Sequence, residues 1–191
     1  MALLLAAVLA VAVLALGAAP AWAGPEVDQA ARALRGDPVY VDPQADPRLS
    51  AGEERGLQQH IASADAGSVY VAVLPESARE EAAGNDPDGL PALLHDALGE
   101  PGTYAVVSGK HLSAGSTQLP EGTSARLARE AIDEHRDEGL DAILTGFVDG
   151  VAAERRGLAG GGAGRGGDGG GDGGGGNGGL VLLGLLAAGG G

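Results

Sequence analysis

The chain has 191 residues, 36 of them glycine, no cysteine and a formal net charge of −14. This length allows one domain of ordinary size with further segments at its ends, and the lack of cysteine excludes disulfides, thiolate metal sites and a cysteine nucleophile. Phosphate binding needs clustered Lys and Arg, and this acidic chain has only 12 such residues with few aromatic side chains, so we expect no nucleic-acid partner.

Residues 1–23 have the order of a secretory signal peptide. An apolar run reaches Leu16, Pro20 breaks it, and the small residues Ala21 and Ala23 occupy the positions that a signal peptidase reads. We therefore predict cleavage after Ala23. No Lys or Arg precedes the apolar run, which leaves an uncleaved anchor as the alternative, although a bilayer span needs about 20 apolar residues.

Residues 24–156 are predicted to form one α/β domain. Apolar residues at helical spacing predict a first helix over 26–35 that ends at Gly36, and a β-branched run predicts a first strand over 38–41. Ser50 and Glu53 have the spacing of a capping box, which opens a helix that reaches about residue 64.

The central strand of the domain is predicted over 68–74, which is apolar on both alternating faces. Asp88 is the expected N-cap of the next helix, which Gly99 ends, and a third strand is predicted over 103–107. Residues 110–117 are expected to return as an antiparallel edge strand, followed by helices over 123–138 and 140–155. Helices between strands imply parallel crossovers, so we expect a small three- to four-stranded, largely parallel sheet with helices on both faces.

The C-terminal part of the chain is predicted to contain a linker and an apolar end. Residues 157–179 are mostly glycine, a composition typical of a flexible, disordered coil. Residues 180–191 are apolar but fewer than the about 20 that a spanning helix needs, so we interpret them as the start of a truncated transmembrane helix. A plain hydrophobic tail is the alternative.

Four polar side chains at predicted strand ends are the weak candidates for a catalytic site: Asp42, Glu76, Ser108 and Lys110. Ligands of open α/β sheets bind beyond the carboxyl ends of the strands, and a cation beside carboxylates suits a phosphate or a metal–phosphate pair. The alternative is that Asp42 and Ser108 are turn residues bound to the backbone. We favour the turn role because the chain has no P-loop, G-x-S-x-G or H-E-x-x-H motif.

No cofactor is predicted from the remaining polar residues. The four histidines are isolated and no pair has the i,i+4 spacing of a zinc site, and the acidic run 133–138 lacks the pattern of a calcium loop. We interpret that run as a solvated helix face. A bound Ca²⁺ or Mg²⁺ ion is expected only under the alternative function given below.

The order of elements over 38–151 resembles the TPM domain family. The resemblance rests on a short strand ending in Asp42-Pro43, a helix opened by Leu49-Ser50, a buried strand, an acidic loop, a helix, and a strand that ends in Val106-Val107-Ser108. It implies an extracytoplasmic α/β domain with an auxiliary role beside membrane proteins, and in some members a weak acid-phosphatase activity. The Asp- and Pro-rich loop after the second strand and the short segment after Ser108 depart from the family pattern.

Two functions are therefore expected from the sequence. The first is a non-enzymatic accessory domain that binds a membrane-protein partner, delivered by the signal peptide and held by a C-terminal anchor on the extracytoplasmic side of the cell membrane. The alternative is a weak phosphatase assisted by Ca²⁺ or Mg²⁺.

Overall fold

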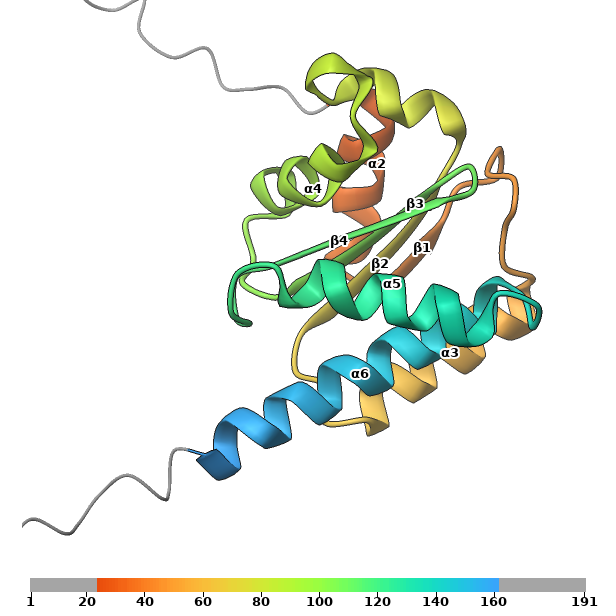
Figure 1. The fold of residues 1–191 in the computed structure, drawn as a ribbon. Helices are drawn as coiled ribbons and strands as arrows, with labels where there is room; N and C mark the ends of the chain where they lie inside the picture. Colours follow the sequence, from red (N-terminus) through yellow and green to blue (C-terminus); the bar gives the residue numbers. More distant parts are fainter. Residues whose placement is uncertain (1–23, 162–191) are drawn as a thin grey trace, which may run out of the picture.

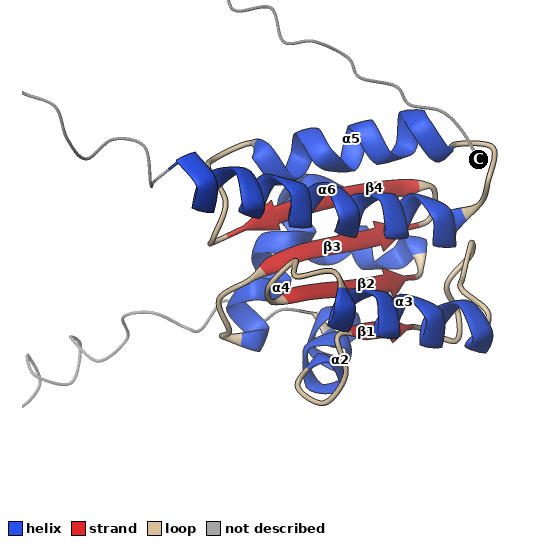
Figure 2. Cartoon of the chain, turned by 90° about the horizontal axis from the view of Figure 1, so that it is seen from below, coloured by secondary structure: helices blue, strands red, loops and turns tan. Residues whose placement is uncertain are grey.

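The structure, a computed structural model, describes residues 24–161 and consists of three layers (Figure 1). A four-stranded sheet lies in the middle, with α2 (Pro25–Leu34) and α4 (Leu90–Leu98) on one face. On the other face lie α3 (Ala51–Ser63), α5 (Thr123–His135) and α6 (Leu140–Gly161), as Figure 2 shows from below. The α/β class with helices on both faces is therefore confirmed.

The strands follow one another in space in their sequence order. They are β1 (Val39–Val41), β2 (Val69–Leu74), β3 (Thr103–Ser108) and β4 (His111–Ser116). The first three are parallel and β4 pairs antiparallel with β3, so the predicted antiparallel edge strand is confirmed. Only two residues separate β3 from β4, and Gly109 has a φ of +59°, which suits the first position of a two-residue hairpin turn.

The core explains why β2 is apolar on both faces. Val71 and Val73 are fully buried against α3, α5 and α6, whereas Ala72 and Leu74 pack among the residues of α2 and α4. A strand covered on both sides needs apolar residues at every position, which is the pattern that predicted it.

Helix ends follow the predicted caps in two places and depart from them in one. Ser50 and Glu53 form the expected capping box, and Gly99 ends α4 in the left-handed conformation at φ +75°. Asp88 is not the cap of α4, because the residue before that helix is Gly89. Three short 3₁₀ helices precede α4: η1 (Glu76–Glu81), η2 (Ala83–Asn85) and η3 (Pro87–Gly89). Asp86 is the capping residue there, because its carboxylate accepts a hydrogen bond from the N–H of Asp88.

The last helix is longer than predicted. It continues to Gly161, so the domain boundary at residue 156 and the linker start at residue 157 both fall inside α6. A helix already held by buried Phe147 and Val148 gains one backbone hydrogen bond with each added residue, so a few glycines do not stop it. The predicted signal peptide (1–23), the rest of the linker and the apolar segment 180–191 lie outside the described residues. Within residues 24–161, no helix combines the length and the apolar character that a bilayer span requires.

Candidate functional site

Asp42, the candidate at the end of β1, holds the turn that follows the strand. Its carboxylate accepts hydrogen bonds from the N–H of Gln44 (2.7 Å) and from the hydroxyl of Tyr40 (3.0 Å). The side chain of Asp42 is buried, and the backbone N–H of Asp42 donates to the carbonyl of Val73 on β2 (2.8 Å). Burial, with the hydrogen bond to Asp42 as a second cause, raises the pKa of Tyr40. The carboxylate thus makes the local bonds that Asp commonly makes in turns.

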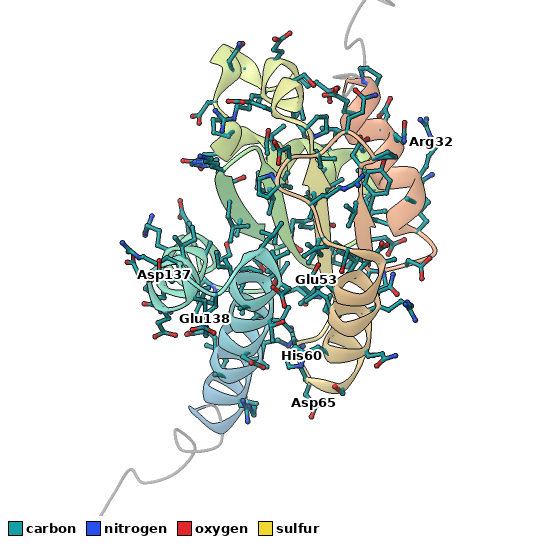
Figure 3. All side chains as sticks on the ribbon, turned by 90° about the vertical axis from the view of Figure 1, so that its right-hand side faces the viewer. Arg32, Glu53, His60, Asp65, Asp137 and Glu138 are labelled. Carbon is teal, nitrogen blue, oxygen red and sulfur yellow. The ribbon has the colours of Figure 1, made fainter. Side chains whose placement is uncertain are left out.

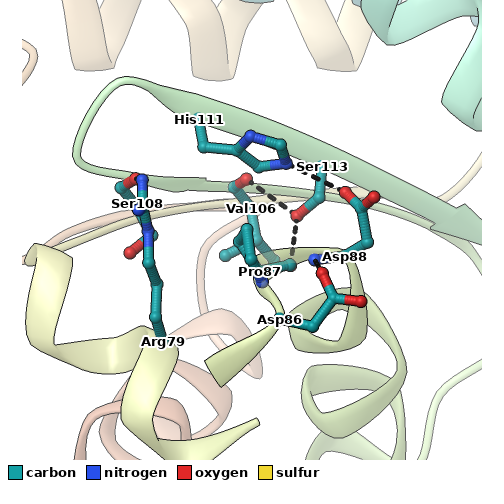
Figure 4. A network of polar contacts seen from close by, with 8 residues as sticks. All are labelled: Arg79, Asp86, Pro87, Asp88, Val106, Ser108, His111 and Ser113. Carbon is teal, nitrogen blue, oxygen red and sulfur yellow. Dashed lines mark hydrogen bonds and ion pairs between the residues drawn. The ribbon is translucent and has the colours of Figure 1, made fainter. Parts of the chain in front are cut away.

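Ser108, the candidate at the end of β3, ties two strand ends together. Its side chain is fully buried, and its hydroxyl donates to the carbonyl of Pro75, the residue that follows β2 (3.0 Å). Its own carbonyl accepts a hydrogen bond from Nη2 of Arg79 on η1 (3.0 Å), which lies beside it in Figure 4. The two acceptors of the Ser108 hydroxyl are the backbone carbonyls of Pro75 and Glu76, and neither can act as a general base that activates a nucleophile.

Glu76 and Lys110 lie near Ser108 but are exposed. Glu76 contacts Arg79 at 3.3 Å, and its side chain lies against the hairpin turn, since a Cβ placed at Gly109 would be 3.5 Å from it. Lys110 is the second turn residue and, among residues 24–161, makes no ion pair. Two exposed side chains of opposite charge therefore lie at the turn, Lys110 within it and Glu76 beside it.

All four candidates lie at the end of the sheet where the parallel strands finish, but only three of them come together there. Glu76, Ser108 and Lys110 gather around the β3–β4 turn. Asp42 follows β1, which pairs with β2 and not with β3, so two strand spacings, about 10 Å, lie between its strand and that of Ser108. Within the described part of the chain, no three His, Asp or Glu side chains are grouped so that they could hold a metal ion.

A polar cluster that sequence reasoning missed joins β4 to η3 (Figure 4). Nε2 of His111 lies 2.9 Å from a carboxylate oxygen of Asp88, and the hydroxyl of Ser113 donates to the carbonyl of Pro87 (2.9 Å). These are the residue types of a Ser-His-Asp triad, but the hydroxyl of Ser113 is buried and bonded to backbone instead of to the imidazole. No local signal could reveal the cluster, because 23 positions separate Asp88 from His111 in the chain.

Two other features between helices have no catalytic arrangement. His60 on α3 lies 2.8 Å from Asp149 on α6, which joins the two helices at the place where Figure 3 labels His60. A groove of about 590 Å³ lies between α5 and α6, and its charged lining includes Glu130, Glu134 and Asp149. Acidic side chains on a solvated surface are what the strongly negative charge of the chain leads one to expect.

The chain matches no protein-family model, no curated protein and no solved structure. What the structure defines is a class: a small three-layer α/β domain whose strand-end hydroxyl and carboxylate hold the backbone in place. The resemblance to the TPM family remains a prediction.

Proposed function

We propose that this protein is an extracytoplasmic, membrane-tethered accessory domain that binds a membrane-protein partner without catalysing a reaction. The observation that carries the proposal is the hydrogen bonding of the Asp42 and Ser108 side chains. Both lie where open α/β sheets bind their substrates, and both are occupied by hydrogen bonds to the backbone, of Gln44 for Asp42 and of Pro75 for Ser108. The signal-like and apolar ends of the sequence support the placement at the membrane.

The placement is tested first. The full chain, expressed in its own cells, is expected in the membrane fraction, where protease added outside degrades the domain. A protein that resists this protease, or that is recovered in the cytosolic fraction, contradicts the placement.

Partner binding is tested by crosslinking in intact cells. We expect the full chain to crosslink to a defined membrane protein. The matched control keeps residues 1–23 and 162–191 and replaces residues 24–161 by an unrelated domain, so that both proteins share the same localisation signals. Recovery of the same crosslinked proteins with the full chain and with the control, or of none above background, contradicts the proposal.

The alternative, a phosphatase assisted by Ca²⁺ or Mg²⁺, makes a different prediction. It requires that the purified full chain hydrolyse a phosphomonoester in a metal-dependent way and that Asp42→Asn lower the rate. No metal-dependent hydrolysis, or hydrolysis that Asp42→Asn leaves unchanged, excludes the assignment of Asp42 to that activity.

A further inference from the structure

An apolar groove of about 360 Å³ opens beyond the carboxyl end of β3. We call it the strand-end groove. It lies between the β3–β4 turn and the connection from α5 to α6, which Figures 1 and 2 show at the same end of the sheet. Its apolar lining consists of Pro47 and five aliphatic side chains: Val107, Leu112, Ile132, Leu140 and Ile143.

The strand-end groove exposes part of the hydrophobic core. Val107 and Leu112 belong to the buried core under α5 and α6, whereas Ile132, Leu140 and Ile143 are only partly buried against it. Large aliphatic residues that remain half-buried around one concave site offer apolar surface to a ligand. The volume is at the lower end of the about 300–1,000 Å³ that small-molecule sites occupy, so the ligand is short.

Cationic side chains stand at the rim of the groove. Lys110 and Arg136 line it, together with His111, and no Asp or Glu is among the described residues that line it. This is the reverse of the charge of the chain as a whole, which carries 26 acidic residues against 12 Lys and Arg. Lys110 is the only lysine in the sequence.

The three rim groups differ in how free they are to bind an anion. Arg136 is bonded to Asp133 on its own helical turn, and His111 is bonded to Asp88. Lys110 extends from the second position of the hairpin turn, is exposed, and has no ion-pair partner within residues 24–161. An anion at the rim would therefore meet the ammonium of Lys110 first and the guanidinium of Arg136 second.

We propose that the strand-end groove binds a small aliphatic carboxylate, with its alkyl chain on the isoleucine and leucine side chains and its carboxylate on Lys110 and Arg136. A fully hydrated phosphate would leave the apolar lining unused, whereas a neutral hydrocarbon would leave the cations unused. Only a ligand with both parts matches both halves of the site. Binding here needs neither a membrane nor a protein partner, so the proposal stands or falls separately from the proposed function.

The test uses a series of straight-chain carboxylates as probes, from butanoate to octanoate, titrated into the purified full chain by calorimetry. Each added CH₂ that enters the groove is expected to tighten binding up to about fourfold. Octanol, which has the chain but no charge, is expected to bind roughly tenfold more weakly than octanoate. Equal affinity across the series, or equal affinity for octanol and octanoate, overturns the proposal.

Two single-residue variants test whether octanoate binds in the strand-end groove. Lys110→Ala is expected to weaken octanoate about threefold without changing the affinity for octanol, since it removes one of the two contacts to the carboxylate, from an exposed position. Arg32→Ala, an equally exposed cation on α2 and on the opposite face of the sheet, is the matched control and should leave binding unchanged. Loss of affinity with both variants, or with neither, overturns the assignment.

Nuclear magnetic resonance supplies an independent readout. Gly109 and Gly139 line the groove, so their amide signals are expected to shift when octanoate binds. Shifts confined to other residues contradict the site. If octanoate fails to bind and a peptide with a free C-terminal carboxylate binds instead, the groove is a protein-docking site and the small-ligand proposal is wrong.

Discussion

Glu81 caps the helix that contains Glu26, although 55 positions separate the two residues in the chain. Its carboxylate accepts hydrogen bonds from the backbone N–H of Glu26 (2.8 Å) and of Val27 (3.0 Å). Pro25 has no N–H and Asp28 donates to the carbonyl of Gly24, so the first turn of α2 has no unpaired donor left. The cap fastens α2 to η1 on the same face of the sheet.

Glu81→Ala should therefore destabilise the domain by about 1–2 kcal/mol, the usual effect of removing a helix cap. Glu80→Ala changes an exposed neighbour of the same 3₁₀ helix and is the control. Gly24→Ala should act like Glu81→Ala, because its Cβ would lie 2.1 Å from the carboxyl carbon of Glu81. The free energy of unfolding from denaturant titration measures all three. An equal effect of Glu80→Ala and Glu81→Ala would show that the cap contributes nothing.

Replacing Val71 by Asp should prevent folding. Val71 is fully buried at the centre of β2 between the two helical layers, and within residues 24–161 no Lys, Arg or His is buried that could pair with a carboxylate there. Burying such a group costs several kcal/mol, comparable with the about 5–15 kcal/mol that stabilise a whole domain. Ala62→Asp, which introduces the same carboxylate at an exposed position of α3, is the control. A soluble Val71→Asp protein with a cooperative thermal transition would contradict the buried position.

The sequence was sufficient for the elements that depend on local patterns. The buried run 69–74, the spacing of Ser50 and Glu53, and Gly99 each specify their element through neighbours a few positions away. The prediction failed where partners are distant. Nothing near Glu81 shows that it caps a helix 55 positions earlier, and Asp88 has the local features of a cap but is bonded to His111.

The candidate site shows the same limit. The predicted strands correctly indicated that Asp42 and Ser108 lie at strand ends. The roles of the two side chains, however, depend on which backbone groups come within hydrogen-bond distance after folding. The strand-end groove was not found because its lining comes from β3, β4, α5 and α6, and its aliphatic residues look like ordinary core positions in the sequence.

The ionisation of Tyr104 should limit stability in alkaline solution. Burial, followed by the nearby Tyr70 and Glu100, raises the pKa of Tyr104 from 10.0 to about 12. Because the folded protein keeps this proton at a pH where the unfolded chain has lost it, the stabilisation is complete below pH 10. It should fall as the pH rises from about 10 to about 12, by up to about 3 kcal/mol.

The control for this pH dependence is a pair of phenylalanine variants. Tyr104→Phe removes the ionisable group and should flatten the decline, at the cost of about 1 kcal/mol for the lost hydrogen bond to the carbonyl of Glu100. Tyr70→Phe retains the ring that stacks on Tyr104 and removes only the contribution of the Tyr70 hydroxyl, which is smaller than that of burial, so it should keep most of the decline. Unfolding free energies measured at several pH values separate these outcomes, and a decline of equal size in both variants would assign it to other groups.

Two glycines of α6 should respond in opposite ways to alanine. Alanine is favoured over glycine in a helix by about 1 kcal/mol, so Gly157→Ala, where an added Cβ meets nothing within 4 Å, should stabilise the protein by up to that amount. At Gly146 the Cβ would lie 2.6 Å from Cδ2 of His135, so the methyl group must push that ring off the helix. His135 is the last residue of α5, and displacing it loosens the packing of α5 on α6, so Gly146→Ala should destabilise.

Denaturant unfolding and far-ultraviolet circular dichroism measure both variants. Gly157→Ala also tests the length of α6, because it can raise helicity and stability only if the helix continues past residue 156, where composition alone places a flexible linker. Gly157→Ala without any effect on helicity or stability would put the end of α6 at the earlier boundary. Gly146→Ala with a gain in stability would show that His135 moves aside freely and that the close approach of the two helices does not depend on this glycine.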